Sequence, residues 1–217
     1  MFTGIIGEIG RVAGAIRERG GIRLTVEAPL SAAELCVNDS VSVNGACQTV
    51  IARTGRTFTV QAVEETLSKT TLGELDPGTE VNLELPVRLN DRLGGHLVLG
   101  HVDCVGSVSG VEVKEGSHVV HITFPASFAK YVIPVGSIAV DGISLTVASS
   151  GGNDLAVAVI PHTLSKTTLS HAREGMRVNL EFDVIGKYVE RLVGVDKEVP
   201  AGALLSAEKL REWGYNI

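Results

Sequence analysis

The sequence predicts an all-β protein that consists of two tandem barrels of homologous sequence, followed by a helical tail. Three observations lead to this prediction. The segment TLSKTTL occurs at residues 66–72 and again, residue for residue, at 163–169. Valine-rich stretches with alternating apolar and polar side chains are short and are separated by glycine and asparagine turns. After Asp183 the apolar spacing changes from that of a strand to that of a helix.

The duplication extends well beyond this heptapeptide. The sequence Val-Asn-Leu-Glu occurs at 81–84 and at 178–181, and residues 44–50 align with 141–147 in the same register. A period this long indicates duplicated domains, because the units of a solenoid are shorter. We therefore expect three parts, which are an N-terminal barrel at 1–97, a C-terminal barrel at 98–184 and a helical tail at 185–217.

Each half contains about six short strands, enough to close a barrel. Clear examples of alternating segments in the first half are 23–26, 40–43 and 57–60. One segment in each half breaks the strand pattern, at 29–35 and at 125–132, and we expect a short helix at both places.

The tail carries apolar residues at an i, i+3, i+4, i+7, i+8 spacing, which predicts an amphipathic helix. This stripe comprises Ile185, Tyr188, Val189, Leu192 and Val193. A second helix is expected to begin after Ser206, with Leu210 and Trp213 on it. Two compact barrels leave such a stripe little to pack on, so we expect the tail to join subunits.

Composition and charge favour a small-molecule partner. The formal net charge is −6 and no basic cluster is present, which argues against a nucleic-acid partner. No apolar run is long enough to predict a membrane span, and the start of the chain lacks the basic residues of a secretory leader. The three cysteines form no CxxC pair, so neither a disulfide framework nor a zinc site is expected, and a cytoplasmic location fits best.

Two other motifs carry little weight. His96 and His101 are five residues apart, which is a chelating spacing in neither a strand nor a helix, so we expect no metal site. The glycines at residues 4–10 do not match GxGxxG and do not lie between a strand and a helix, so we interpret them as glycines at strand bends.

The aligned repeat places small polar groups at equivalent positions of both halves. Cys47 aligns with Ser144, and Thr49 aligns with Thr146 two residues further on. On a strand, residues two apart share a face. Two equivalent ligand pockets would have this pattern, although a cysteine in such a place is also commonly a small buried apolar residue.

An ionisable imidazole occurs in only one of the two halves, since Ile5 aligns with His101. His101 with the hydroxyl groups of Ser144 and Thr146 could form a proton relay. Structural hydrogen bonding by the same residues is the alternative, and Asp141 and Asp183 are open to the same interpretation as turn or strand-end residues. The divergence between the halves suggests two ligands held in related but different roles.

Several motifs together resemble the riboflavin synthase alpha-chain family. They are the start at 1–5, the run at 94–101, the segment 141–147, both TLSKTTL segments and the segment 185–191. The resemblance covers nearly the whole chain. It implies two six-stranded Greek-key barrels and a C-terminal helix that assembles a homotrimer, and it leaves association with lumazine synthase open.

The resemblance also implies an activity. Members of the family convert two molecules of 6,7-dimethyl-8-ribityllumazine into riboflavin and 5-amino-6-ribitylamino-uracil, which moves a four-carbon unit without a cofactor or metal. Their active site lies between the N-terminal barrel of one subunit and the C-terminal barrel of another. Two identical substrates must then lie against each other as donor and acceptor, so orientation supplies much of the rate.

Site residues follow from the resemblance position by position. The implied catalytic set is His101, Ser144, Thr146, Cys47, Asp141 and Asp183. The implied substrate-binding set is Phe2, Thr3, Gly4, Ile5, Ile6, Ser40, Cys47, Gln48, Thr49, Gln61, Ala62, Val63, Glu64, Glu65, Thr66, His96, Gly100, His101, Val102, Val135, Ser144, Leu145, Thr146, Ala158, Val159, Ile160, Pro161, His162 and Thr163.

The chain departs from the family pattern at two positions. Gln48 stands where many members have leucine, and Val135 stands where many have lysine. The first difference changes the polarity of one contact. The second removes a cation that could contact the ligand across the subunit boundary, which predicts weaker substrate binding. If that cation instead stabilises the charge of the carbanion, we expect slower turnover or a substitute cation, for which Lys130 is the nearest candidate.

The chemical roles allow alternatives. Deprotonation of the 7-methyl group of one lumazine would give a carbanion that adds to the other ring, with His101 and Ser144 or Thr146 as the candidate relay. Either Cys47 or water could add to the partner ring. A non-catalytic lumazine- or flavin-binding protein is the alternative function, whereas a flavin-dependent oxidoreductase would need a nicotinamide-binding βαβ unit that the sequence lacks.

Overall fold

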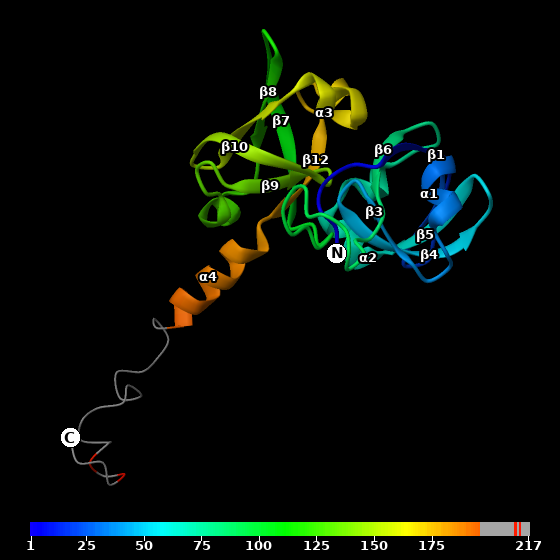
Figure 1. Ribbon diagram of the computed structural model, residues 1–217, viewed down its shortest axis with the longest axis horizontal. Coiled ribbons are helices and arrows are strands. Elements are labelled where there is room, and N and C mark those ends of the chain that lie inside the picture. Colours follow the sequence, from blue (N-terminus) through cyan, green and yellow to red (C-terminus); the bar gives the residue numbers. More distant parts are fainter. Residues whose placement is uncertain (196–210, 212, 214–217) are drawn as a thin grey trace. The chain divides into compact units, whose positions relative to one another are not determined.

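The computed structural model describes residues 1–195, 211 and 213. Its contacts divide the chain into two units, Met1–Val184 and Ile185–Ile217. The first unit contains two β-barrels that lie side by side, with the N-terminus near their junction (Figure 1). We propose residues 97 and 98 as the boundary between the two halves of this unit.

The first barrel closes in the order β1-β2-β5-β4-β3-β6, and every neighbouring pair is antiparallel. Its strands are β1 (Glu8–Glu18), β2 (Gly21–Glu27), β3 (Ser40–Val43), β4 (Ala46–Arg53), β5 (Thr57–Val63) and β6 (Glu80–Glu84). Strand β2 pairs with β5, and β6 returns to lie between β1 and β3, which is a Greek-key arrangement.

The second barrel repeats this order as β7-β8-β11-β10-β9-β12. Its strands are β7 (Cys104–Lys114), β8 (Ser117–Thr123), β9 (Ser137–Val140), β10 (Ile143–Gly151), β11 (Asp154–Val159) and β12 (Arg177–Phe182). Even the irregularities recur, because register shifts occur in β4 at Val50/Ala52 and in β10 at Val147/Ser149. The predicted duplication of a six-stranded barrel is therefore confirmed.

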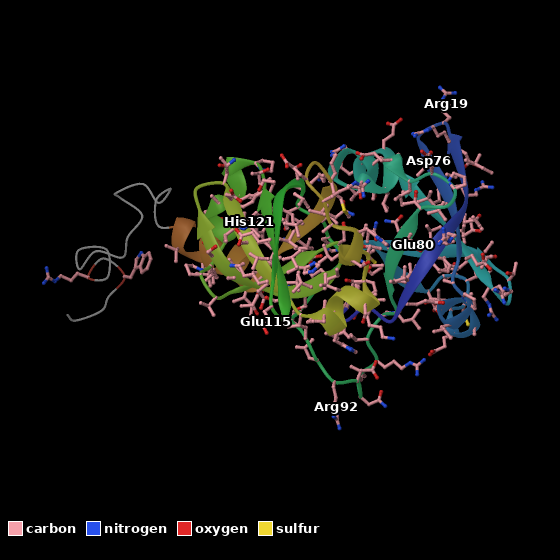
Figure 2. All side chains as sticks on the ribbon, turned by 90° about the horizontal axis from the view of Figure 1, so that it is seen from above. Arg19, Asp76, Glu80, Arg92, Glu115 and His121 are labelled. Atoms are coloured by element: carbon pink, nitrogen blue, oxygen red, sulfur yellow. The ribbon has the colours of Figure 1, made fainter. Side chains whose placement is uncertain are left out.

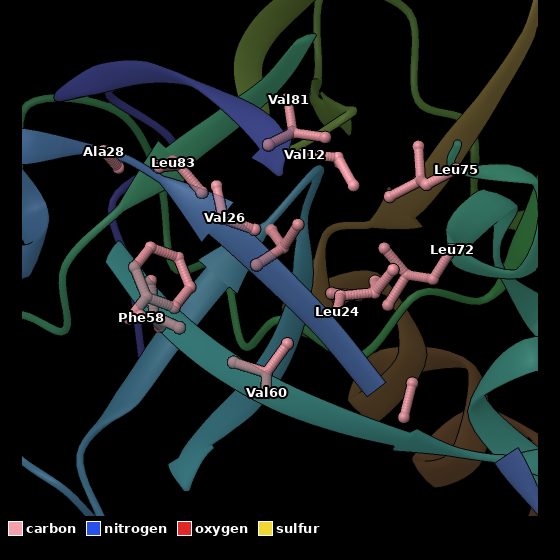
Figure 3. Packing of buried hydrophobic residues seen from close by; sticks show 14 of the residues in the cluster. Val12, Leu24, Val26, Ala28, Phe58, Val60, Leu72, Leu75, Val81 and Leu83 are labelled. Atoms are coloured by element: carbon pink, nitrogen blue, oxygen red, sulfur yellow. The ribbon is translucent and has the colours of Figure 1, made fainter. Parts of the chain in front are cut away.

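Each barrel has its own apolar core. It is formed by every second residue of each strand, because successive side chains point alternately into and out of the barrel. In the first barrel Leu24, Val26, Phe58 and Val60 have no exposed surface and pack across the interior (Figure 3). In the second barrel the ring of Phe182 stacks on Phe128 with their centroids 5.6 Å apart. Most charged residues lie outside, and Figure 2 shows several of them pointing away from the strands, including Arg19, Asp76 and Glu115.

Short helices occur where the strand pattern is interrupted. The first is α1 (Pro29–Glu34), as predicted. The second is the 3₁₀ helix η2 (Ala126–Tyr131), which lets Phe128 and Tyr131, three residues apart, both reach the ring of Phe182.

The TLSKTTL segments fold alike in both halves. Each forms one turn of α-helix followed by one of 3₁₀ helix. These elements are α2 (Glu64–Lys69), η1 (Thr71–Glu74), α3 (Pro161–Lys166) and η3 (Thr168–His171).

Helix α4 (Val184–Val195) confirms the helix predicted after Asp183. The five residues of its predicted stripe are each more than half exposed. The second helix predicted after Ser206 falls almost entirely on residues outside the described part of the chain. No helix within the described residues is both long and apolar enough to cross a membrane.

Candidate active site

Two cavities occupy equivalent positions in the two halves. The first, of about 220 Å³, lies beside β4 and α2 and is called the N pocket below. The second, of about 330 Å³, lies beside β10 and α3 and is called the C pocket. A larger cleft of about 710 Å³ lies near α1 and the segment that links the barrels, but all the residues that line it belong to the first half, and they include the ion pair of Arg88 with Glu34. We therefore place the candidate site in the two repeat-related pockets.

The strand facing each pocket has the alternation expected from the sequence. Cys47 is half-buried and Thr49 is exposed on one face of β4, while the residues between and beside them are buried. Ser144 and Thr146 are related in the same way on β10. The predicted equivalence of the two polar faces is therefore present in the fold, with a thiol in one pocket and a hydroxyl in the other.

Each pocket is completed by the segment that leads into the other barrel. The first lead segment (residues 2–6) precedes β1 but lines the C pocket, through Gly4 and the residues after it. The second lead segment (residues 98–102) precedes β7 but lines the N pocket, through residues 100–102. This exchange was not predicted from the sequence.

Glycine is required where each lead segment crosses. The carbonyl of Gly4 accepts a hydrogen bond from the N–H of Ser144 (2.8 Å), and the carbonyl of Gly100 accepts one from the N–H of Cys47 (2.9 Å). A Cβ atom would lie 2.5 Å from Ser144 Cβ at the first glycine and 2.6 Å from Cys47 Cβ at the second. Both glycines also have φ near +79°, a conformation that other residues rarely adopt.

The C pocket contains a serine and histidine pair. Ser144 Oγ lies 2.7 Å from His96 Nδ1. Burial lowers the pKa of His96, and the nearby Asp183 carboxylate only partly opposes this effect, so the imidazole is neutral at pH 7. Its Nε2 is buried and has no hydrogen-bond partner among the described residues. A ligand in the C pocket can therefore touch Ser144, while His96 acts from behind it.

Within one chain, this pairing differs from the predicted relay. His101 was expected to act with Ser144 or Thr146, but it is exposed and lines the N pocket beside Cys47. No hydrogen bond joins His101 to either hydroxyl within the described residues. The cause is the exchange of lead segments, which carries the residue after Gly100 to the first barrel.

A reciprocal set of buried hydrogen bonds joins the two barrels. Asn82 of β6 has no exposed surface and its Oδ1 accepts from the N–H of Thr168 (2.8 Å). Asn179, at the equivalent place in β12, accepts in the same way from the N–H of Thr71 (2.8 Å). Each asparagine thus holds the start of the 3₁₀ helix of the other half.

The same two asparagines hold the tight turns before β4 and β10. The amide of Asn82 donates to the carbonyl of Asp141 (3.0 Å), and that of Asn179 donates to the carbonyl of Asn44 (2.8 Å). In return, the side chain of Asn44 accepts from the N–H of Asn82 (2.7 Å), and that of Asp141 accepts from the N–H of Asn179 (2.8 Å). The two barrels are therefore fixed relative to each other by matched polar contacts.

Asp141 differs from its repeat partner Asn44 only in being ionisable. Burial raises the pKa of Asp141 to about 7, although the N–H of Asn179 stabilises the carboxylate. Asp141 is 2% exposed and borders neither pocket. The structure therefore places this implied catalytic residue in the junction between the barrels, where it positions β10.

The remaining implied residues are distributed as follows. The implied residues that line the N pocket are Cys47, Gln48, Glu65, Thr66, Gly100, His101 and Val102. Those that line the C pocket are Gly4, Ile5, Ile6, Ser144, His162 and Thr163. Exposed positions beside the pockets are held by Thr49, Gln61, Val63, Glu64, Thr146, Ala158, Ile160 and Pro161, and Ser40 is half-buried on β3.

Six implied binding residues outside the two pocket linings are buried. Thr3 and His96 are hydrogen-bonded to Glu84 and Ser144, and the other four have apolar surroundings. Ala62, Leu145 and Val159 belong to the barrel interiors, because they occupy the inward positions of their strands. Phe2 has no exposed surface and packs with Val98, Ala139 and Cys47 between the barrels. These side chains support the pockets from within and offer a ligand no free surface in this chain.

Sequence reasoning also missed residues that build the site. Asn82, Asn179, Glu84 and Glu181 hold the junction or the lead segments, yet none was a candidate. Their signal was the exact repeat of Val-Asn-Leu-Glu, in which two polar residues recur at the end of a strand.

Val135, the departure from the family pattern, has an unusual backbone. Its φ is +61°, and its repeat partner Asn38 also has a positive φ, of +78°. Asparagine tolerates this region, but a β-branched residue is strained in it. Val135 is also 79% exposed, so its side chain gains little from packing in this chain.

We expect Val135→Asn to stabilise the protein by about 1 kcal/mol, because it relieves backbone strain without loss of a buried contact. The free energy of unfolding in guanidinium, measured at matched protein concentration, checks this. The reciprocal Asn38→Val should destabilise by a similar amount. A Val135→Asn variant that is less stable than the parent would show that the valine side chain packs on something outside the single chain.

The two halves match one family model. Residues 3–86 and 99–183 each match the model described as the lumazine binding domain. Over 197 residues the chain is 47% identical to the riboflavin synthase of Mycobacterium tuberculosis (strain H37Rv), and the match covers 89% of this chain and 98% of that one. The chain belongs to the riboflavin synthase family. This confirms the resemblance inferred from the motifs.

More distant riboflavin synthases match over nearly the full length. The one from Actinobacillus pleuropneumoniae is 36% identical and the one from Bacillus subtilis is 35% identical, and each match covers 99% of this chain and 100% of the relative. A crystal structure of LumP complexed with 6,7-dimethyl-8-(1'-D-ribityl)lumazine superposes with a TM-score of 0.75 at 23% identity, over 83% of this chain and 98% of that one. The latter likeness shows that the two-barrel fold is shared.

Proposed function

We propose that the protein catalyses the riboflavin synthase reaction, in which two molecules of 6,7-dimethyl-8-ribityllumazine give riboflavin and 5-amino-6-ribitylamino-uracil by transfer of a four-carbon unit. The observation that carries this proposal is the pair of repeat-related pockets with different chemistry. One reaction with two identical substrates in different roles needs two pockets of one shape and two sets of polar groups.

Ser144 and His96 supply the acid–base function in this proposal. The hydroxyl borders the C pocket, and a proton taken up at Ser144 Oγ can pass to His96 Nδ1 over 2.7 Å. The proton comes from the 7-methyl group of the lumazine in this pocket, and the carbanion left behind attacks the ring of the second lumazine. The neutral state of the buried imidazole keeps it able to accept that proton at pH 7.

The N pocket holds the second lumazine. Cys47 and His101 both border this pocket, so either the thiol or a water molecule held by the imidazole can add to the acceptor ring. Contact between the two lumazines requires an N pocket and a C pocket to face each other. We propose that a homotrimer achieves this, with the N pocket of one chain opposite the C pocket of the next.

The exposed apolar stripe of α4 supports assembly. Its residues repeat at helical spacing and are more than half exposed, as expected for a helix that packs on other copies. Sedimentation of the full-length chain measures the number of chains in the assembly.

We expect the protein, after treatment with a chelator, to form one riboflavin for every two lumazines consumed, with no other substrate added. Absorbance and fluorescence of the separated products measure both quantities. A protein that binds lumazine without forming riboflavin would be a binding protein, and a requirement for added metal or nicotinamide would contradict the proposed reaction.

A further inference from the structure

The two lead segments are anchored by a matched pair of buried carboxylates. Glu84 ends β6, and its two oxygens accept hydrogen bonds from the N–H of Thr3 (2.6 Å), the hydroxyl of Thr3 (2.7 Å) and the N–H of Gly4 (2.9 Å). Glu84 is 7% exposed. The four residues that end with Glu84, Val-Asn-Leu-Glu, occur again at the end of β12.

Glu181 anchors the second lead segment in the same way. Its oxygens accept from the N–H of Leu99 (2.7 Å) and from the N–H of Gly100 (2.9 Å), and it is 3% exposed. A carboxylate that is removed from water is stabilised by several N–H donors at once. Each glutamate therefore fixes two consecutive backbone amides of a lead segment.

Gly4 and Gly100 connect each glutamate to a pocket residue of the opposite barrel. Gly4 donates its N–H to Glu84 of the first barrel and accepts through its carbonyl from Ser144 of the second. Gly100 donates its N–H to Glu181 of the second barrel and accepts from Cys47 of the first. One residue thus separates each carboxylate from a pocket residue on the other barrel.

Apolar packing follows the same crossed pattern. Ile6, at the end of the first lead segment, packs against the core of the second barrel. Val102, at the end of the second lead segment, packs against the core of the first barrel. The crossing therefore involves side chains as well as backbone hydrogen bonds.

We propose that Glu84 and Glu181 are crossed positioning residues: Glu84 of the first barrel sets the geometry of the C pocket, and Glu181 of the second barrel sets that of the N pocket. Their effect on turnover rests on the proposed function, whereas their effect on pocket geometry does not. The proposal predicts that a pocket responds to the carboxylate of the other barrel and not to that of its own.

The thiol of Cys47 provides a direct test, because it is half-buried in the N pocket under Gly100. Glu181→Gln replaces an acceptor oxygen by an amide that meets a backbone N–H, so the second lead segment loosens. We expect alkylation of Cys47 by iodoacetamide, followed by mass spectrometry of its peptide, to become at least threefold faster. Glu84→Gln should leave this rate within a factor of two, although Glu84 is in the same barrel as Cys47.

Three variants separate positioning from general loss of stability. Glu181→Asp keeps both acceptor oxygens, so it should restore much of the parent Cys47 rate. Val157→Ala removes a core contact of the second barrel, whose core cluster contains no residue of the second lead segment, and it should leave the rate near that of the parent. Gly100→Ala forces the second lead segment off Cys47, so it should accelerate alkylation even if the glutamine variant fails to fold.

Turnover gives a second readout. Both glutamine variants should lower kcat/KM for riboflavin formation at least tenfold, while Val157→Ala retains kcat. Equal Cys47 rates in Glu84→Gln and Glu181→Gln would overturn the crossed assignment, as would an unchanged rate in both Glu181→Gln and Gly100→Ala. Failure of the parent protein to form riboflavin would refute the proposed reaction. The alkylation rates of Cys47 would still test whether Glu181 sets the geometry of the N pocket.

Discussion

Replacement of Ser144 by alanine is expected to lower kcat for riboflavin formation by roughly 10²–10⁴-fold, the range for loss of a positioned acid–base group. Ser144 borders the C pocket and contacts His96 Nδ1 at 2.7 Å, so its removal separates the imidazole from any ligand there. Binding of lumazine should persist, because the rest of the pocket wall remains. Steady-state kinetics and a fluorescence titration measure the two quantities separately.

His96→Ala should cause a similar loss, since the imidazole acts through the serine hydroxyl. If the two residues form one relay, the double variant is no slower than either single variant, because members of a unit are not additive. His121→Ala is the matched control, because His121 is on the outer face of β8 and pairs with Glu112. If kcat of the double variant falls by the product of the factors found for the two single variants, the relay is contradicted.

The pH profile provides an independent check on His96. Burial lowers the pKa of this imidazole, so it stays neutral to a lower pH than an ordinary histidine. In the parent protein, kcat should therefore fall only on the acid side of the ordinary histidine range. A profile that falls at or above the ordinary histidine pKa would assign the base to another group.

The sequence predicted the fold well because duplication and alternation act locally. The repeated heptapeptide located both halves, and alternation on 46–50 and 143–147 predicted which side chains face the pockets. These features depend on residues close in the chain, so no knowledge of long-range contacts was needed.

The candidate site was predicted less completely because its parts come from both barrels. Sequence order assigned His101 to the second half, and only the fold shows that its lead segment crosses to the first. His96 reaches Ser144 across 48 positions of sequence, through a backbone hydrogen bond of its own N–H to the carbonyl of Thr3. Alignment of the two halves with each other cannot detect such an exchange, because it preserves the register of the repeat.

The roles of buried polar residues were also beyond sequence reasoning. Asn82 and Asn179 occur in strands that otherwise look like ordinary core strands. Their exact recurrence was visible, but their partners are turns of the opposite half. A repeated polar residue inside an apolar strand is therefore a useful signal of a contact between duplicated domains.

Asp141→Asn is expected to stabilise the protein, and the gain should grow with pH. Burial in the folded state raises the pKa of Asp141 to about 7 from its ordinary value of 3.8, so folding takes up a proton between these pH values. The stability contributed by the protonated form is present at low pH and is lost as the pH rises through 7. Asparagine at this position reproduces the contacts that Asn44 already makes in the other half.

The difference in unfolding free energy between Asp141→Asn and the parent should increase by about 3 kcal/mol from pH 5 to pH 8. Guanidinium unfolding at equal chain concentration at the two pH values measures it, since association would otherwise shift the midpoint. The matched control is Asn44→Asp, which introduces the same ionisable group at the equivalent turn and should lose stability as the pH rises. Because Asp141 borders neither pocket, Asp141→Asn should keep kcat within tenfold of the parent. A larger loss of kcat would support the catalytic role that the resemblance implies for Asp141.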